Sequence, residues 1–140
     1  MTGRILGIDF GDAHTGIAVS DPLGITAQPH GAVNEKEMAR VVIAVAEAAT
    51  MLGATAVVVG LPMNMNGSEG PRAKLSRDFG AQLGEVLSVP IHFWDERLTT
   101  AQAGRALRGR GGKKRKMGID VVSAQVMLQS YLDAAARGAR

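Results

Sequence analysis

The alternation of apolar and polar residues along the chain predicts a mixture of strands and helices. Short apolar runs rich in β-branched residues predict strands at residues 4–10, 17–20, 55–62 and 89–96. A weaker strand is predicted at 25–33, where Pro29 favours an edge position or a bulge. Apolar residues at helical spacing predict helices at 34–53, 72–87 and 119–136, and a short helix at 99–107.

The order of these elements predicts the architecture. The first two strands form a hairpin, the weak third strand extends it, and the later strands follow through helical connections (β-β-β-α-β-α-β-α). Connections of this kind are right-handed and place the later strands parallel to the first. We therefore expect a single α/β domain over residues 1–140, with a mixed five-stranded sheet and helices on both faces.

Sequence signals also predict the ends of the first long helix. Asn34 is a favourable N-cap, which places Glu35 and Glu37 in the first turn, where the helix dipole stabilises carboxylates. Gly53 is expected to end the same helix.

Length and composition narrow the class of protein. The chain has 140 residues, 46% of them hydrophobic and 21% charged, which is ordinary for one globular domain. It contains no cysteine, so a disulfide scaffold and a thiolate metal site are excluded. No apolar stretch approaches the roughly 20 residues that span a bilayer, and the N-terminus has no signal-peptide pattern. A cytoplasmic protein without a membrane partner is expected.

The positive charge is concentrated in one segment. The chain carries 16 basic and 13 acidic residues, a net charge of +3. Seven of the basic residues lie within 105–116, with no acidic residue among them: Arg105, Arg108, Arg110, Lys113, Lys114, Arg115 and Lys116. Nine basic and 13 acidic residues remain elsewhere, a net charge of −4. This basic segment is either a solvated loop or a contact for a polyanion, and its charge density favours nucleic acid.

Several acidic residues occupy positions where carboxylates are unusual. Asp9 stands among apolar residues in the predicted central strand, and a desolvated carboxylate is costly unless a partner pairs with it. Asp95 and Glu96 end the last predicted strand, where sites form in open α/β sheets. Asp120 begins the apolar last helix. The structural alternatives are a helix cap for Asp120 and surface ion pairs with Arg97 or nearby lysines for the strand-end acids.

Together these acids predict a site for one or two divalent cations. Two Mg²⁺ or Mn²⁺ ions about 3.5–4 Å apart, held by carboxylates, activate water and neutralise charge during phosphodiester hydrolysis. The three histidines, His14, His30 and His92, are expected to serve in turns and packing rather than as metal ligands.

Four stretches of the chain resemble one protein family. They are GIDFG followed by TGIAVSD, then VVVGLPMNMNGSEGPRA, WDERLTT and GIDVVSAQVMLQSYLD, and they cover nearly the whole chain. They are similar to the YqgF-like family of pre-16S rRNA nucleases and Holliday junction resolvases, which has a ribonuclease H-like fold. The resemblance implies a metal-dependent nuclease that processes the 5′ end of pre-16S rRNA or, alternatively, resolves branched DNA. It implies Asp9, Glu96 and Asp120 as catalytic metal ligands, with Asp95 as a neighbouring acid.

The chain departs from the family pattern at two places. The turn after Asp9 carries Ala13 and His14 where the family has a Lys-Arg pair, so a phosphate contact is missing unless His14 supplies it. Related resolvases carry an acid at the end of the fourth strand, whereas this chain has the run Gly60–Pro62. The third carboxylate is therefore expected from the fifth strand, one strand further from Asp9.

Further residues are candidates for contact with nucleic acid, each with a structural alternative. Gly11 lets the backbone approach a phosphate, or simply forms a turn. The loop and helix start at 64–74 offer polar groups near a helix N-terminus, where phosphates bind. Thr99 caps the short helix or touches the substrate. The full set is Gly11, His14, Asn64, Asn66, Ser68, Arg72, Arg97, Thr99, Arg108, Arg110, Lys113, Lys114, Arg115 and Lys116.

The residues also leave two other functions open. GIDFG followed by a polar turn is similar to the first phosphate loop of sugar kinases and actin-type ATPases, which close two domains around a nucleotide. A non-catalytic nucleic-acid-binding domain would keep the fold without cleavage. The few aromatic residues lie in predicted packed elements, which favours recognition of shape and backbone over base reading. A homodimer would suit a two-fold DNA junction.

Overall fold

The computed structural model of the protein describes residues 3–99 and 119–138, without the side chains of residues 119 and 120. Five strands form one sheet: β1 (Arg4–Asp9), β2 (Thr15–Ser20), β3 (Ala27–Val33), β4 (Ala54–Leu61) and β5 (Ile91–Asp95). Their order across the sheet is β3-β2-β1-β4-β5. β1 pairs antiparallel with β2 and parallel with β4, so the sheet is mixed and β1 is its central strand.

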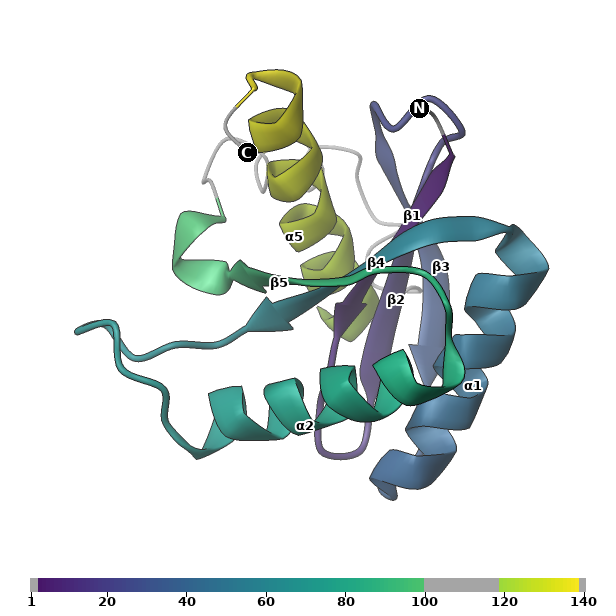
Figure 1. Cartoon of the computed structure of the whole chain (residues 1–140). Helices are drawn as coiled ribbons and strands as arrows, with labels where there is room; N and C mark the ends of the chain where they lie inside the picture. Colours follow the sequence, from purple (N-terminus) through teal and green to yellow (C-terminus); the bar gives the residue numbers. More distant parts are fainter. Residues whose placement is uncertain (1–2, 100–118, 139–140) are drawn as a thin grey trace.

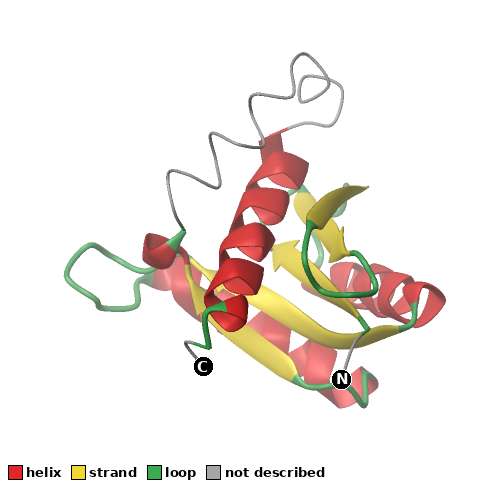
Figure 2. Cartoon of the chain, turned by 90° about the horizontal axis from the view of Figure 1, so that it is seen from above, coloured by secondary structure: helices red, strands yellow, loops and turns green. Residues whose placement is uncertain are grey.

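Helices cover both faces of this sheet (Figure 1). α1 (Met38–Leu52) and α2 (Pro71–Val86) pack on one face. α5 (Ile119–Ala136) lies across the other face, mainly over β1, β2 and β3 (Figure 2). A short 3₁₀ helix, η1 (Glu96–Leu98), follows β5 directly. The predicted fold class, a mixed five-stranded α/β sheet with helices on both faces, is confirmed.

Two other sequence predictions concern a short helix and the absence of membrane-spanning segments. Beyond Thr99, the short helix predicted at 99–107 lies outside the described residues. Across residues 3–99 and 119–138, no helix is long and apolar enough to cross a membrane.

The main core lies between the sheet and the layer formed by α1 and α2. Alternate residues of β1 and β4 are fully buried in it: Leu6, Ile8, Val57 and Val59. Phe10, just after β1, stacks on Phe79 of α2 with 4.8 Å between the ring centroids. This packing fixes the end of the central strand against α2.

The opposite face of the sheet is built from small residues that let α5 approach closely. Ala18 of β2 and Ala124 of α5 are both fully buried there. A Cβ on Gly7 would lie only 2.7 Å from the Cβ of Leu128, so the helix sits where a larger residue in β1 would push it away. Because side chains alternate along a strand, Asp9 is on the same face as Gly7, away from the main core.

Two boundary predictions are confirmed. Gly53 ends α1 in the left-handed conformation, with φ of 66°, and its N–H bonds to the carbonyls of Ala49 and Thr50. β3, which contains Pro29, is an edge strand, and its pairing with β2 is irregular beside that residue.

The predicted start of α1 is wrong. The helix begins at Met38, its N-cap position is Glu37, no side chain caps it, and its first turn carries no acidic residue. Asn34 instead forms a hydrogen bond of 2.8 Å between its Oδ1 and Nδ1 of His14. The Asn34 side chain thus bonds to a residue that is distant in sequence. This contact joins two loops, and the local sequence pattern does not reveal it.

Candidate active site

The carboxyl ends of β1, β4 and β5 meet at one edge of the sheet. The three strands are parallel, and this edge is where α/β sheets place their sites. Ile8 of β1 pairs with Val59 of β4, and Gly60 pairs with Trp94 of β5. Asp9, Gly60 and Trp94 therefore stand at the same level on three neighbouring strands.

Glu96 reaches Asp9 across the end of β4. The fifth strand was predicted to include Glu96, but it ends at Asp95, and Glu96 is the first residue of η1. The turn carries the Glu96 side chain back over Gly60, where a Cβ would overlap its Oε2 and lie 3.2 Å from its Cγ and Cδ. The Glu96 carboxyl shares a hydrogen bond with Asp9. A carboxyl group of β1 and one from the turn after β5 thus meet above the glycine of the strand between them.

The surroundings of this pair raise the pKa of Glu96 to about 7. Burial of the carboxyl is the largest cause, followed by the negative charge of Asp9 and the hydrogen bond to it. The positive charge of Arg72 acts in the opposite direction. The pair holds a proton near neutral pH when no cation is bound, because two adjacent carboxylates repel each other if both are ionised.

The pair has the chemistry of a divalent-cation site. Its groups are carboxylates, the oxygen donors that Mg²⁺ and Mn²⁺ prefer, and a cation can replace the shared proton. Within the described residues, no group of three or more histidine, cysteine or acidic side chains is placed to hold a metal ion. The third predicted ligand, Asp120, is the second residue of α5, and its side chain lies outside the description.

Asp95 is held by Arg97. It accepts a hydrogen bond of 2.9 Å from the Arg97 backbone N–H and one of 2.6 Å from Nη2 of the guanidinium. The Arg97 side chain is the main cause that lowers the pKa of Asp95. Arg97 also donates to the carbonyl of Met65, at 3.3 Å. This ion pair therefore joins the end of β5 to the loop that follows β4.

That loop, residues 62–70, extends from the same edge of the sheet (Figure 1). Its polar side chains bond mainly to one another. Oδ1 of Asn66 accepts from the N–H and the Oγ of Ser68, at 3.0 and 2.6 Å, and Nδ2 of Asn64 donates to the same Oγ at 3.0 Å. The three predicted contact residues of this loop thus form one cluster, which fixes its shape.

Arg72 links the start of α2 to the turn after β1. Its guanidinium forms an ion pair with Asp12 and donates to the carbonyl of Phe10 at 3.1 Å. Pro71 occupies the first turn of α2, and no side chain caps that helix. Arg72 lies close to the carboxyl pair, as its effect on Glu96 shows, but Asp12 already engages it.

The remaining predicted contacts lie around the same edge. A Cβ on Gly11 would overlap the carbonyl oxygen of His14, so the turn after β1 closes too tightly for any other residue. The backbone N–H of Thr99 donates to the carbonyl of Glu96 at 3.1 Å. The candidates of the basic segment lie outside the described residues: Arg108, Arg110, Lys113, Lys114, Arg115 and Lys116.

Sequence reasoning missed two residues of this edge. In the sequence, Gly60 stands out only as part of the run that replaces the acid of related resolvases. The feature that could have revealed its role is a glycine inside an otherwise β-branched, buried strand. Asp12 carried no signal, because a turn aspartate is common and its partner Arg72 is 60 residues away.

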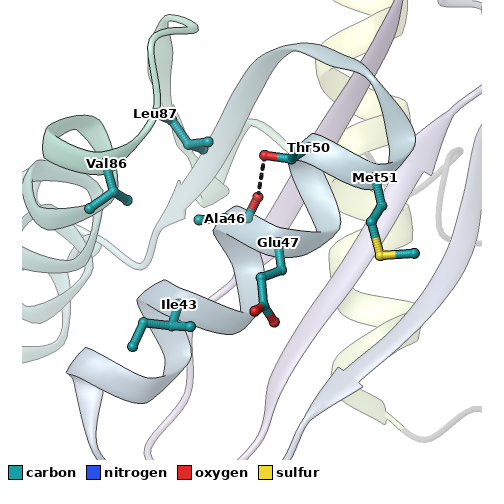
Figure 3. A pocket seen from close by; sticks show the side chains of 7 residues that line it. All are labelled: Ile43, Ala46, Glu47, Thr50, Met51, Val86 and Leu87. Atoms are coloured by element: carbon teal, nitrogen blue, oxygen red, sulfur yellow. Dashed lines mark hydrogen bonds between the residues drawn. The ribbon is translucent and has the colours of Figure 1, made fainter.

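An apolar groove between α1 and α2 was also not predicted (Figure 3). It is lined by Ile43, Ala46, Glu47, Thr50, Met51, Val86 and Leu87. These residues come from the later turns of α1 and the end of α2. Both helices run away from the edge that carries Asp9, so the groove is separate from the carboxyl pair.

Comparisons with known sequences identify relatives along nearly the whole chain. The family model RuvX, described as "Holliday junction resolvase", matches residues 3–134. A Moorella thermoacetica protein is 44% identical over 132 residues, which covers 93% of this chain and 94% of that protein. A protein of Caldanaerobacter subterraneus subsp. tengcongensis is 46% identical over 135 residues, with coverage of 93% and 96%. Both relatives carry the name "Putative pre-16S rRNA nuclease".

Solved structures share the fold. RuvC of Thermus thermophilus in complex with a Holliday junction substrate superposes with a TM-score of 0.65 at 19% identity, covering 97% of this chain and 96% of that one. Fowlpox virus resolvase in complex with Holliday junction DNA gives 0.60 at 12% identity, covering 94% and 98%. At these identities the likeness shows the fold alone, that of ribonuclease H-like resolvases. With the family match, it confirms the resemblance seen in the sequence: the chain belongs to the RuvX (YqgF-like) family of nucleases, which hydrolyse phosphodiester bonds.

Proposed function

We propose that the protein is a divalent-metal-dependent nuclease that processes the 5′ end of pre-16S rRNA in the cytoplasm. The observation that carries the catalytic part is the pair of carboxyl groups, Asp9 and Glu96, which share a hydrogen bond at the carboxyl ends of the parallel strands. The names of the relatives that are 44% and 46% identical support the choice of substrate.

Asp9, Glu96 and Asp120 would hold one or two Mg²⁺ or Mn²⁺ ions. When bound, such ions supply an activated water and neutralise charge on the attacking and leaving oxygens. Asp9 is fixed by the central strand, and Glu96 by the turn of η1, so the two carboxylates keep their relative positions without rearrangement of the backbone. The burial that raises the pKa of Glu96 also strengthens its attraction to a cation.

The substrate would be held by its phosphates. The tight turn at Gly11, Arg72 at the start of α2, and the loop at 62–70 lie at the same edge of the sheet as the carboxyl pair, and the basic segment follows η1 in the chain. Backbone and shape recognition of this kind suits a structured RNA.

A DNA junction is the second candidate substrate. The description of the matching family model favours it. A resolvase cuts two strands of a two-fold junction, so this function calls for a homodimer.

The decisive experiment offers both substrates to the same preparation. Wild type and Asp9→Asn are incubated with a precursor carrying the 5′ extension of 16S rRNA and with a four-way DNA junction, each with Mg²⁺, Mn²⁺ or a chelator. We expect metal-dependent cleavage of the RNA by wild type and none by the variant. Cleavage of the junction alone would select the second candidate. Binding of either substrate without any cleavage would mean that the domain only binds nucleic acid.

A further inference from the structure

Gly60 stands at the centre of the candidate active site, although it has no functional group. It lies on β4 between Asp9 of β1 and Trp94 of β5, at the same level of the sheet. The three nearest atoms to a Cβ built on this glycine all belong to the Glu96 side chain: Oε2, Cγ and Cδ. The Glu96 carboxyl therefore occupies the space that a side chain of residue 60 would fill.

The backbone does not explain why residue 60 is glycine. Gly60 is not among the glycines with positive φ, and it sits in a regular strand whose other members include Val57, Val58 and Val59. A β-branched residue would favour that strand more than glycine does. The local feature that a larger side chain would meet is the Glu96 side chain, which would have to shift to make room for it.

We infer that Gly60 is a positioning residue of the nuclease: its missing side chain admits the Glu96 carboxyl to Asp9, and position 60 can itself carry that carboxyl. The inference rests on the proposed function of the Asp9–Glu96 pair. The claim that position 60 can carry the carboxyl rests on a distance: a Cβ on residue 60 would lie 3.2 Å from the Cδ of Glu96. An aspartate there would project its carboxylate into the place that Glu96 now fills.

The first test substitutes a methyl group. Gly60→Ala forces the Glu96 carboxyl off its place, so we expect kcat to fall by about 10-fold or more, as for loss of a supporting contact in a metal site, while KM for the nucleic acid stays within about threefold. Gly84→Ala is the matched control, because a Cβ on that helical glycine meets only Ile91 at an ordinary 3.6 Å. A Gly60→Ala enzyme with wild-type kcat would overturn the inference.

The second test moves the acid from one strand to the other. The Gly60→Asp/Glu96→Ala double variant should recover cleavage and Mn²⁺ binding relative to Glu96→Ala. Gly60→Asn/Glu96→Ala, which has the same shape without the charge, should recover neither. Equal activity and equal Mn²⁺ binding of these two double variants would refute the claim that position 60 can carry the carboxyl.

A third measurement does not depend on cleavage. The crystal structure of metal-free Gly60→Ala should show the Glu96 carboxyl displaced from Asp9, with β4 unchanged. If wild type neither cleaves nor binds Mn²⁺ but this displacement is seen, the proposed function fails and the steric role of Gly60 stands. A carboxyl still on Asp9 beside Ala at position 60 would show that the glycine is not needed.

Discussion

The carboxyl groups of Asp9 and Glu96 share a hydrogen bond, although Asp9 belongs to β1 and Glu96 to the turn after β5. Strand β4 lies between β1 and β5 in the sheet. The Glu96 side chain thus extends over β4 to reach Asp9 on the central strand. Because the groups are so close and Glu96 is largely buried, a proton or a cation must neutralise part of their charge.

The first prediction separates stability from activity at Asp9. Asn keeps the shape and hydrogen bonding of Asp9 but removes one of two repelling charges, so Asp9→Asn should be no less stable than wild type when metal is chelated. Cleavage should fall by more than about 100-fold, beyond the effect of losing a supporting residue. Thermal unfolding in a chelator and a cleavage assay measure the two effects. A variant that unfolds earlier yet cleaves at the full rate would show that Asp9 is merely structural.

The second prediction distinguishes the adjacent acids Asp95 and Glu96. Glu96→Gln should lower kcat by about 100-fold or more, because it removes a ligand that faces Asp9. Asp95→Asn should lower it by less than about 10-fold, because Asp95 binds Arg97 and acts only through the neighbouring turn and loop. The measurement is kcat for both variants under saturating substrate. Losses of similar size would remove the distinction between the two residues.

Much of this arrangement could be predicted from the sequence, because it depends on short-range patterns. The strand that carries Asp9, the end of α1 at Gly53 and the edge position of β3 all follow from local composition. The path of Glu96 did not follow, because the strand predicted at 89–96 extends one residue beyond the end of β5 at Asp95. Asp95 ends the strand by capping η1, and the turn rather than the pleat aims Glu96 at Asp9.

A contact between distant residues accounts for the error at the start of α1. Asn34 has the sequence character of an N-cap, but His14, 20 residues away, engages its side chain. Arg72 stays a predicted phosphate contact at a helix start, and its ion pair with Asp12 of the turn after β1 is a further distant contact that the local pattern does not reveal. Local sequence preference indicates which conformations and contacts are favourable for a residue. Contacts with distant residues then decide which of them forms in the folded protein.

The third prediction concerns the pH dependence of stability without metal. The pKa of Glu96 is about 7 in the folded protein against an ordinary value of 4.5, so the folded state binds this proton more tightly than the unfolded state. The resulting stabilisation is fully present below the ordinary value and is lost as the pH rises through about 7. Glu96→Gln carries no such proton. In a chelator, the unfolding free energy of wild type relative to Glu96→Gln should therefore fall between pH 5 and pH 8, and denaturant curves across that range measure it. A constant difference would contradict the shared proton.

The fourth prediction concerns the ion pair between Asp12 and Arg72. The Asp12 side chain is 83% exposed, so the pair contributes little stability, about 0–1 kcal/mol. Asp12 instead competes with a phosphate for the guanidinium. The Asp9→Asn/Asp12→Asn double variant should therefore bind nucleic acid several-fold more tightly than Asp9→Asn alone. The Asp9→Asn change prevents cleavage, so Kd can be measured for both proteins.

The control for this change is Glu85→Gln, which removes the same charge from an exposed position near the end of α2. It should leave Kd nearly unchanged. Equal gains from Asp12→Asn and Glu85→Gln would mean that net charge alone, and not release of Arg72, improves binding.

The last prediction is that the basic segment binds substrate and takes no part in the chemical step. Glycines separate Arg108, Arg110 and the run of four basic residues that begins at Lys113, which suits a loop that follows phosphates better than a rigid catalytic element. Neutralising Lys113, Lys114, Arg115 and Lys116 together should weaken binding and flatten its salt dependence. Each phosphate contact adds about −0.9 to the slope of log affinity against log salt on duplex DNA, and about −0.7 on single strands. Single-turnover cleavage at saturating enzyme should stay near the wild-type rate.

The matched comparison removes charge elsewhere on the surface. Lys36, Arg40 and Arg137 are exposed and lie outside the segment, and their change to glutamine should alter the salt slope less per charge removed. A salt titration of binding for wild type and both variants, beside the single-turnover rate, gives the answer. An unchanged slope in the quadruple variant would mean that the segment is only solvated and that phosphates bind elsewhere. A slowed single-turnover rate at saturation would instead place part of the segment at the reacting phosphate.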